Sequence, residues 1–185
     1  MKVLNIKNLI KEFGDVRILD NISFDIEKGT TNCIIGPNGT GKTTIFNIIN
    51  GFILPNTGNI QYCGEPIIGL PPWKIARLGV GRLFQDIRLF NEMTVLENIL
   101  VSFPNYSFEK VSSSLLTRWK IKKKEQEIIE KAEKLLMLVK LQDKASCIGK
   151  NLSFGEQKLL AFAKVLATDS NLLLLDEPFA GLNYY

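Results

Sequence analysis

The chain has 185 residues, of which 23 are Lys or Arg, 19 are Asp or Glu, three are Cys and none is His. This length and an apolar fraction of 45% are typical of one globular domain, or of one domain with a small subdomain, and the net charge of +4 is too small to indicate binding to nucleic acid. The absence of histidine excludes Ser-His-Asp and Cys-His catalysis, histidine-ligated zinc and an imidazole pH switch.

The first thirty residues have the pattern of β structure. Residues 3–6 and 18–26 are rich in apolar and β-branched side chains and are predicted strands. Within the second segment the apolar side chains recur at the two-residue period of a strand, at Ile22, Phe24 and Ile26. Residues 31–35 are predicted to form a short, buried strand of a parallel sheet that leads into a glycine-rich loop.

The middle of the chain alternates between helix and strand patterns. A helix follows the glycine-rich loop and stops at Gly51, and Pro72 marks the start of another. Residues 59–62 and 79–84 are predicted strands. A further helix begins at Thr94, because Glu97 stands three residues later in the arrangement of a capping box.

The last part of the chain is rich in helix before one apolar strand. Residues 121–141 predict a long, charged amphipathic helix, and a loop near residue 153 precedes a helix that ends at Ala167. The apolar run of residues 172–175 is predicted to be a buried strand. Strands alternate with helices throughout, so the sequence predicts an α/β protein with a mainly parallel sheet.

Residues 36–43 match the phosphate-binding pattern G-x-x-x-x-G-K-[ST], and the predicted flanking strand and helix are the context that this pattern requires. Its backbone N–H groups and the helix N-terminus favour a phosphate, while Lys42 is expected to reach the β- and γ-phosphates and Thr43 to bind Mg²⁺. The predicted phosphate-binding residues are Gly36, Pro37, Asn38, Gly39, Thr40, Gly41, Lys42, Thr43 and Thr44.

Two carboxylates follow the apolar run of residues 172–175. Ligands of open α/β sheets bind at the carboxyl ends of the strands, which is where Asp176 and Glu177 are predicted to lie. Asp176 suits Mg²⁺, directly or through water, and Glu177 suits the polarisation of an attacking water molecule.

The segment Leu-Ser-Phe-Gly-Glu-Gln at residues 152–157 resembles the LSGGQ signature of ATP-binding-cassette (ABC) ATPases. This resemblance implies that the segment binds the γ-phosphate of an ATP molecule held by a partner cassette, so that two cassettes pair head to tail. The residues concerned are Ser153, Phe154, Gly155, Glu156 and Gln157.

Other motifs of the ABC family can be recognised, and the resemblance covers the whole chain. Phe13 and Val16 resemble the adenine-contacting positions, and Gln85 resembles the Q-loop glutamine, which contacts Mg²⁺ and the attacking water. The expected catalytic residues are Glu177, Gln85 and Lys42, and the expected Mg²⁺ ligands are Thr43, Gln85 and Asp176. The D-loop across the dimer interface is expected at Ala180, Gly181, Leu182 and Asn183.

The resemblance implies a P-loop NTPase fold of the ABC type, as one incomplete nucleotide-binding domain over residues 1–185. Residues 1–87 and 156–185 are expected to form a RecA-like core with an N-terminal antiparallel β subdomain, and residues 88–155 an inserted helical subdomain. Family members continue with a strand that ends in a histidine, and this chain stops before it. We therefore expect a C-terminally truncated fragment that binds ATP weakly and hydrolyses it poorly.

Within the family, the sequence is most similar to the LivG-type ATPases of branched-chain amino acid importers, and the matching stretches are residues 69–72, 75–79, 84–90, 93–98 and 176–183. The implied function is ATP hydrolysis, with Mg²⁺, coupled to solute uptake through transmembrane permease subunits. The implied partners also include a second ABC ATPase and, indirectly, a solute-binding protein. Importers of urea or amides share much of the wording and are alternatives, as is an inactive nucleotide-binding fragment. A soluble ABC ATPase of translation or DNA repair is a further alternative.

The sequence also predicts where the chain works. The three cysteines are widely spaced, which indicates free thiols in a reducing compartment. No apolar run is long enough to span a bilayer. The predicted location is therefore the cytoplasm, with peripheral attachment to the cytoplasmic face of the cell membrane.

Overall fold

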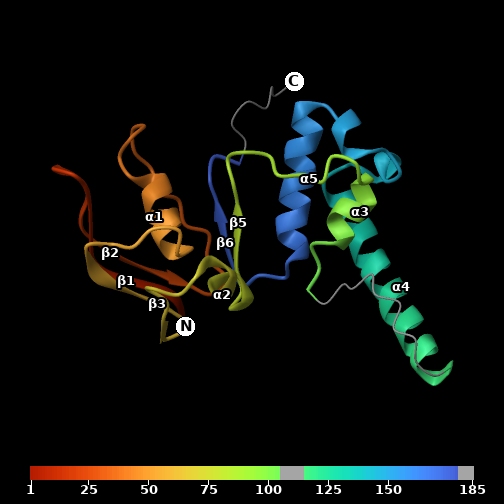
Figure 1. The fold of residues 1–185 in the computed structure, drawn as a ribbon, viewed down its shortest axis with the longest axis horizontal. Coiled ribbons are helices and arrows are strands. Elements are labelled where there is room, and N and C mark those ends of the chain that lie inside the picture. The colour runs from red at the N-terminus through yellow and green to blue at the C-terminus, as the bar shows by residue number, and fades with distance from the viewer. Residues whose placement is uncertain (105–114, 179–185) are drawn as a thin grey trace. The chain divides into compact units, whose positions relative to one another are not determined.

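The computed structural model describes residues 1–104 and 115–178, with side chains described outside residues 115–121. The chain divides into two compact units, Met1–Val80 and Gly81–Tyr185 (Figure 1). Each unit contains a sheet and helices, so the predicted α/β class is confirmed.

The first unit contains a four-stranded antiparallel sheet. Its strands are β1 (Lys2–Phe13), β2 (Val16–Glu27), β3 (Thr57–Tyr62) and β4 (Glu65–Pro66), in the order β2-β1-β3-β4. The strands predicted at residues 3–6, 18–26 and 59–62 are therefore confirmed. The inward side chains that form the core of the sheet include Leu4, Ile6, Leu9, Leu19 and Ile60, all at most 2% exposed.

Two short helices complete the first unit. Helix α1 (Lys42–Ile49) buries Ile45, Ile48 and Ile49, and α2 (Pro72–Arg77) begins at the proline that predicted it. The chain turns away from α1 at Gly51, whose φ is 73°. A Cβ atom there would lie 2.4 Å from the carbonyl oxygen of Leu70, so the turn requires glycine.

The strand predicted at residues 31–35 is wrong. These residues have no regular secondary structure and are exposed, and the Ile35 side chain is 90% exposed. A strand exists only through ladder hydrogen bonds to a neighbouring strand. Among the described residues no strand pairs with this segment, so its β-branched side chains have no sheet in which to be buried.

Strand β5 (Val80–Leu83), which lies in the second unit from Gly81 onward, pairs with β6 (Leu172–Leu175), and both strands were predicted from the sequence. The two strands run in the same direction. Gly81 lies beside Leu173 and Ser170 at the start of the pair, whereas the Asp176 amide donates to the Leu83 carbonyl at its end. The carboxyl ends of both strands therefore meet at one edge.

A cluster of three helices packs in the second unit, α3 (Val95–Leu100), α4 (Leu115–Leu138) and α5 (Phe154–Ala167) (Figure 1). The 3₁₀ turns Gln142–Lys144 and Gly149–Asn151 link α4 to α5. Both predicted features of these helices are confirmed: the Thr94–Glu97 capping box, and the apolar face of α4, where Ala132 and Leu136 are at most 1% exposed. The buried core of the cluster consists of Val95, Ile99, Leu100, Ala132, Leu136, Val139, Leu141, Leu152, Leu160, Ala163 and Ala167.

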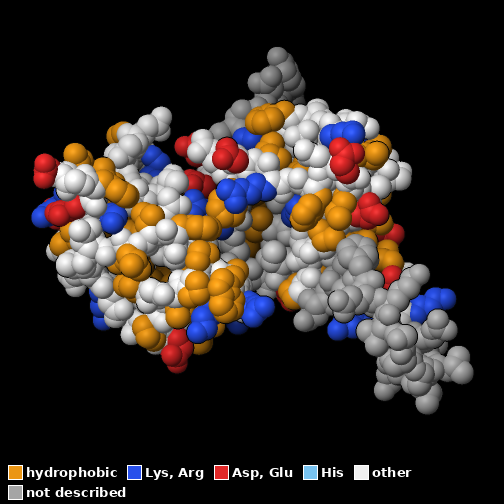
Figure 2. Space-filling view, viewed as in Figure 1, with side chains coloured by type: hydrophobic (Ala, Val, Ile, Leu, Met, Phe, Trp, Pro, Cys, Tyr) orange, Lys and Arg blue, Asp and Glu red, His pale blue; other side chains and the backbone are white. Residues whose placement is uncertain are grey.

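The surface of the molecule carries charges of both signs, with hydrophobic side chains scattered between them on the face shown in Figure 2. The largest exposed apolar side chains of the first unit include Phe13, Val16, Phe52, Leu54 and Trp73.

The fully buried Asn98 ties the segment before α3 to the helix cluster. Its Oδ1 accepts a 2.9 Å hydrogen bond from the amide of Phe90, and its Nδ2 donates at 3.0 Å to the carbonyl oxygens of Phe90 and Thr94. Asn98→Ala removes the acceptor of the Phe90 amide, whereas the carbonyls of Phe90 and Thr94 keep the backbone donors of Met93 and residue 98. We expect it to lower the free energy of unfolding by about 1–3 kcal/mol, measured by urea denaturation.

The matched control is Asn151→Ala, on an exposed residue, which is expected to change the stability by less than about 0.5 kcal/mol. Equal stability of Asn98→Ala and Asn151→Ala would contradict the role of Asn98.

Candidate functional site

The glycine-rich loop leads into α1, whose first residue is Lys42. Gly41 precedes the helix with a left-handed φ of 91°, and a Cβ atom there would lie 2.6 Å from Leu19 Cδ2, so only glycine fits. The Lys42 ammonium donates hydrogen bonds of 2.7 Å to the carbonyl oxygens of Gly36 and Pro37. The loop thus closes around its own lysine, and these two hydrogen bonds fix the position of the ammonium.

The surroundings of this loop suit an anion. No side chain caps the N-terminus of α1, and residues 36–40 are exposed. Helix N-terminal amides carry a partial positive charge and attract phosphate groups. The backbone and Lys42 together therefore form a site with the sign and the accessibility that a polyphosphate requires.

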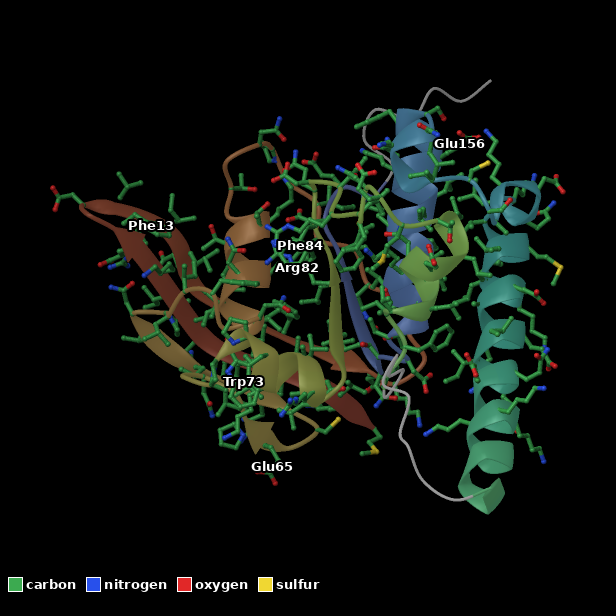
Figure 3. All side chains as sticks on the ribbon, turned by 45° about the vertical axis from the view of Figure 1, so that its right-hand side comes forward. Phe13, Glu65, Trp73, Arg82, Phe84 and Glu156 are labelled. Carbon is green, nitrogen blue, oxygen red and sulfur yellow. The ribbon has the colours of Figure 1, made fainter. Side chains whose placement is uncertain are left out.

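Phe13 and Val16 lie on either side of the turn between β1 and β2, at the tip of the hairpin in Figure 3. The side chains of Phe13 and Val16 are 50% and 60% exposed, and Lys11 Nζ lies 4.9 Å from the centre of the Phe13 ring. An aromatic ring that is half exposed can stack on a planar base.

In the second unit, the structure brings Gln85, Asp176 and Glu177 to one pocket at the carboxyl ends of β5 and β6. Asp176 is 6% exposed, and Glu177 is exposed with a left-handed φ of 46°. A non-glycine residue in that conformation costs about 1–2 kcal/mol, so the backbone turn immediately after β6 is strained. The other described residues that line the pocket are Leu83, Phe84, Ile87, Lys158, Ala161 and Pro178.

Sequence reasoning missed Arg82, which forms a buried ion pair with Asp176. The Arg82 guanidinium donates to Asp176 Oδ2 at 3.2 Å, and the two side chains are 5% and 8% exposed. Burial lowers the pKa of Arg82, and the ion pair with Asp176 partly offsets this effect. The signal available in the sequence was a charged residue in the middle of the strand predicted at residues 79–84.

The segment at residues 152–157 begins α5 with a complete capping box. The Ser153 hydroxyl accepts from the Glu156 amide at 3.4 Å, and Glu156 Oε2 accepts from the Ser153 amide at 3.0 Å and from its hydroxyl at 2.9 Å. The remaining residues are placed by α5 too: Phe154 is 57% exposed, Gly155 follows it, and Gln157 donates to the Leu152 carbonyl at 3.0 Å.

The carboxylate of Glu156 is neutralised locally. Lys144 Nζ lies 2.5 Å from Glu156 Oε1, and this ion pair, followed by the hydrogen bonds from Ser153, holds the pKa of Glu156 below its usual value. Glu156 lies at the upper end of α5 in Figure 3. The lysine offsets the negative charge that would otherwise oppose an anion at this helix terminus.

The oxygen donors predicted from the sequence fit Mg²⁺, which prefers carboxylate, amide and hydroxyl oxygens and keeps several ligands from water or phosphate. Asp176 and Gln85 share one pocket, and Thr43 lies in the first unit. Among the described residues no group of three or more His, Cys, Asp or Glu could enclose a metal ion. This donor set therefore suits a cation that arrives with phosphates rather than an all-protein cage.

Two further observations complete the description. The D-loop predicted at Ala180, Gly181, Leu182 and Asn183 lies outside the described residues. Within the part of the chain that the structure describes, no helix has the length and apolar character needed to cross a bilayer.

The sequence profile of the ABC transporter family matches residues 19–180. Among curated proteins, the probable branched-chain amino acid transport ATP-binding protein LivG of Archaeoglobus fulgidus is 40% identical over 99% of this chain and 70% of its own. The high-affinity branched-chain amino acid transport ATP-binding protein LivG of Escherichia coli K12 is 37% identical over 98% of this chain and 71% of its own.

Solved structures agree with these relatives. The ADP conformation of MJ1267, an ATP-binding cassette of an ABC transporter, has a TM-score of 0.78 and 35% identity, over 99% of this chain and 71% of that one. The protein cbiO1 of Clostridium perfringens, part of the ABC transporter complex cbiONQ, has a TM-score of 0.78 and 28% identity, over 98% and 68% of the two chains. The chain thus spans about seven-tenths of the length of these relatives.

Proposed function

The chain belongs to the ABC transporter family of ATP-binding proteins, and from this membership we propose that it is the ATP-binding and ATP-hydrolysing subunit of an importer for branched-chain amino acids. The observation that carries the ATP-binding part is the loop of residues 36–41 closed around Lys42 at the start of α1. The similarity to LivG proteins of two organisms supports the choice of solute.

The proposed reaction uses groups from both units. The loop amides and Lys42 bind the β- and γ-phosphates, and Phe13 with Val16 contacts the adenine. Thr43, Gln85 and Asp176 would hold Mg²⁺, which when bound would neutralise charge on the phosphate oxygens. Glu177 orients the attacking water and accepts its proton while the water oxygen bonds to the γ-phosphorus and the bond to the bridging oxygen breaks, so that ADP leaves with that oxygen.

The segment that begins α5 is proposed to act on a second ATP molecule. Ser153 and the following amides would receive the γ-phosphate held by a partner cassette, with Lys144 offsetting the charge of Glu156. The residues of the D-loop, 180–183, are proposed to lie at the same dimer interface. The partner is a second ABC ATPase, either a copy of this chain or a different subunit.

The importer also requires contact with a membrane protein. We assign this contact to Gln85 and residues 86–103, and propose that residues 88–155 form the helical subdomain of the cassette. The chain then works at the cytoplasmic face of the membrane, bound to permease subunits, and serves a solute-binding protein indirectly.

Phe13→Ala tests the adenine contact. Loss of one stacked ring is expected to weaken ATP binding by about 1–2 kcal/mol, roughly 5- to 30-fold, in a calorimetric titration. The affinity for inorganic triphosphate should not change, because the triphosphate has no base. Phe52→Ala is the matched control, since Phe52 is a phenylalanine of the same unit with a 49% exposed side chain. Unchanged ATP affinity in Phe13→Ala would refute the contact.

The solute is tested by replacing a LivG subunit with this chain and measuring uptake of radiolabelled leucine and of urea. Restored leucine uptake that depends on Lys42 supports the proposal. Restored urea uptake alone would assign the chain to the urea importers. ATP binding without any restored transport would identify an inactive nucleotide-binding fragment.

A further inference from the structure

Arg82 is the one described arginine whose ion pair is almost completely buried, and its partner is the carboxylate proposed to hold Mg²⁺. Taking an arginine and an aspartate out of water costs several kcal/mol for each ion, and this cost is offset only when the geometry of the pair is fixed. A hydrophobic residue would fill position 82 at lower cost. The presence of the pair therefore calls for a role of its own.

Arg82 approaches Asp176 from outside the pocket. The pocket is lined by Gln85, Asp176 and Glu177, but Arg82 is not among the described residues that line it. An ionised carboxylate has about four acceptor positions on its two oxygens; the bond from Arg82 is made on Oδ2, and Asp176 itself lines the pocket. Asp176 can therefore keep its bond to Arg82 and still present oxygen to a cation in the pocket.

A stack of side chains connects Arg82 to the residue before Gln85. The Arg82 guanidinium lies 4.9 Å from the centre of the Phe84 ring, and the Arg88 guanidinium lies 4.3 Å from the same ring. Arg82 and Phe84 lie next to each other in Figure 3. Cation–π contacts of this kind restrict both the ring and the guanidinium, so the stack limits where the backbone at Gln85 can lie.

We infer that Arg82 is a positioning residue for the cation site. It fixes one oxygen of Asp176 by a hydrogen bond and, through its contact with Phe84, fixes the position of Gln85 relative to Asp176. The inference rests on the proposed function of the pocket. Groups that orient a metal ligand through a hydrogen bond commonly change metal affinity by about 10- to 100-fold when they are removed. The effect belongs to the cation, so it should be absent when ATP binds without Mg²⁺.

The test compares ATP affinity in excess Mg²⁺ with ATP affinity in EDTA, using a fluorescent ATP analogue and the whole chain. The ratio of the two affinities is the cation-dependent gain. Arg82→Met should lower this gain by about 10- to 100-fold and leave the affinity in EDTA within twofold. Arg82→Lys should restore part of the gain, because an ammonium can donate to Oδ2. In an Asp176→Asn background, Arg82→Met should have no further effect.

Arg88→Met separates the ion pair from the ring contact, because it makes the same chemical change on the same Phe84 ring and no ion pair joins Arg88 to Asp176 among the described contacts. It should lower the gain less than Arg82→Met does. A gain that rises in Arg82→Met would show that Arg82 competes with the cation and would overturn the inference. A loss of affinity that is equal in EDTA and in Mg²⁺ would leave the gain unchanged and show a merely structural role. Wild-type affinity in both conditions would show no role. If Arg82→Met does not fold, Arg82→Lys decides the question by the same ratio. Failure of the proposed function looks different, because the wild-type chain would then not bind the analogue in EDTA.

Discussion

Lys42→Ala is expected to weaken ATP binding by about 1.5–3 kcal/mol, roughly 10- to 150-fold, because it removes charge-assisted hydrogen bonds to the phosphates. In the structure the ammonium already has a place at the mouth of the loop, 2.7 Å from the Gly36 and Pro37 carbonyls. Binding of the polyphosphate therefore exchanges these carbonyls for charged oxygens without ordering a free side chain. The measurement is a calorimetric titration with ATP in EDTA, so that cation binding does not contribute.

Lys28→Ala is the matched control for this experiment. Lys28 lies in the same unit, in the exposed turn after β2, and carries the same charge. It should leave ATP affinity within twofold, and both variants should melt at temperatures close to that of the wild type. ATP affinity that is equal in Lys42→Ala and Lys28→Ala would show that the loop does not bind phosphate as proposed.

The elements that could be predicted from sequence are those whose signals are local. The capping box of Thr94 and Glu97, the proline at the start of α2 and the four leucines of β6 each depend on residues that are neighbours in the chain. Such signals need no knowledge of the rest of the fold. The same is true of the phosphate loop, where Gly41 meets the backbone requirement of the helix start within the pattern itself.

The failures come from residues whose state depends on distant partners. Residues 31–35 have β propensity but no paired strand among the described residues, and propensity alone does not form a ladder. Arg82 is 94 residues from Asp176, and no local pattern links them. Asn98 likewise joins Phe90 and Lys164, which the sequence separates by 74 positions. Long-range polar contacts of this kind were the part of the site that sequence reasoning missed.

The other large effect is expected at Glu177. Glu177→Gln keeps the shape of the side chain but cannot accept a proton, so single-turnover ATP hydrolysis should fall by about 10²- to 10⁴-fold. ATP affinity should stay within twofold, because the phosphates are bound by the loop of the first unit in the proposed site. Release of radiolabelled phosphate with the protein in excess over ATP measures slow rates directly. In the family mechanism the variant should also accumulate as an ATP-bound dimer in size-exclusion chromatography.

Glu125→Gln, an exposed glutamate of α4, is the control for the loss of charge alone and should leave hydrolysis unchanged. A hydrolysis rate in Glu177→Gln within fivefold of the wild type would remove Glu177 from the reaction, and a variant that stays monomeric with ATP would contradict the paired-cassette arrangement.

The backbone conformation of Glu177 allows its effect on stability to be separated from its effect on hydrolysis. Its φ of 46° costs a side-chain-bearing residue about 1–2 kcal/mol, and glycine carries no such cost. Glu177→Gly should therefore stabilise the fold by about 1 kcal/mol in urea denaturation while it abolishes hydrolysis, whereas Glu177→Gln retains the strain and loses only the chemistry. Backbone strain persists at a position when the function requires a particular side chain there. Removal of that side chain is then expected to raise the stability and to abolish the activity.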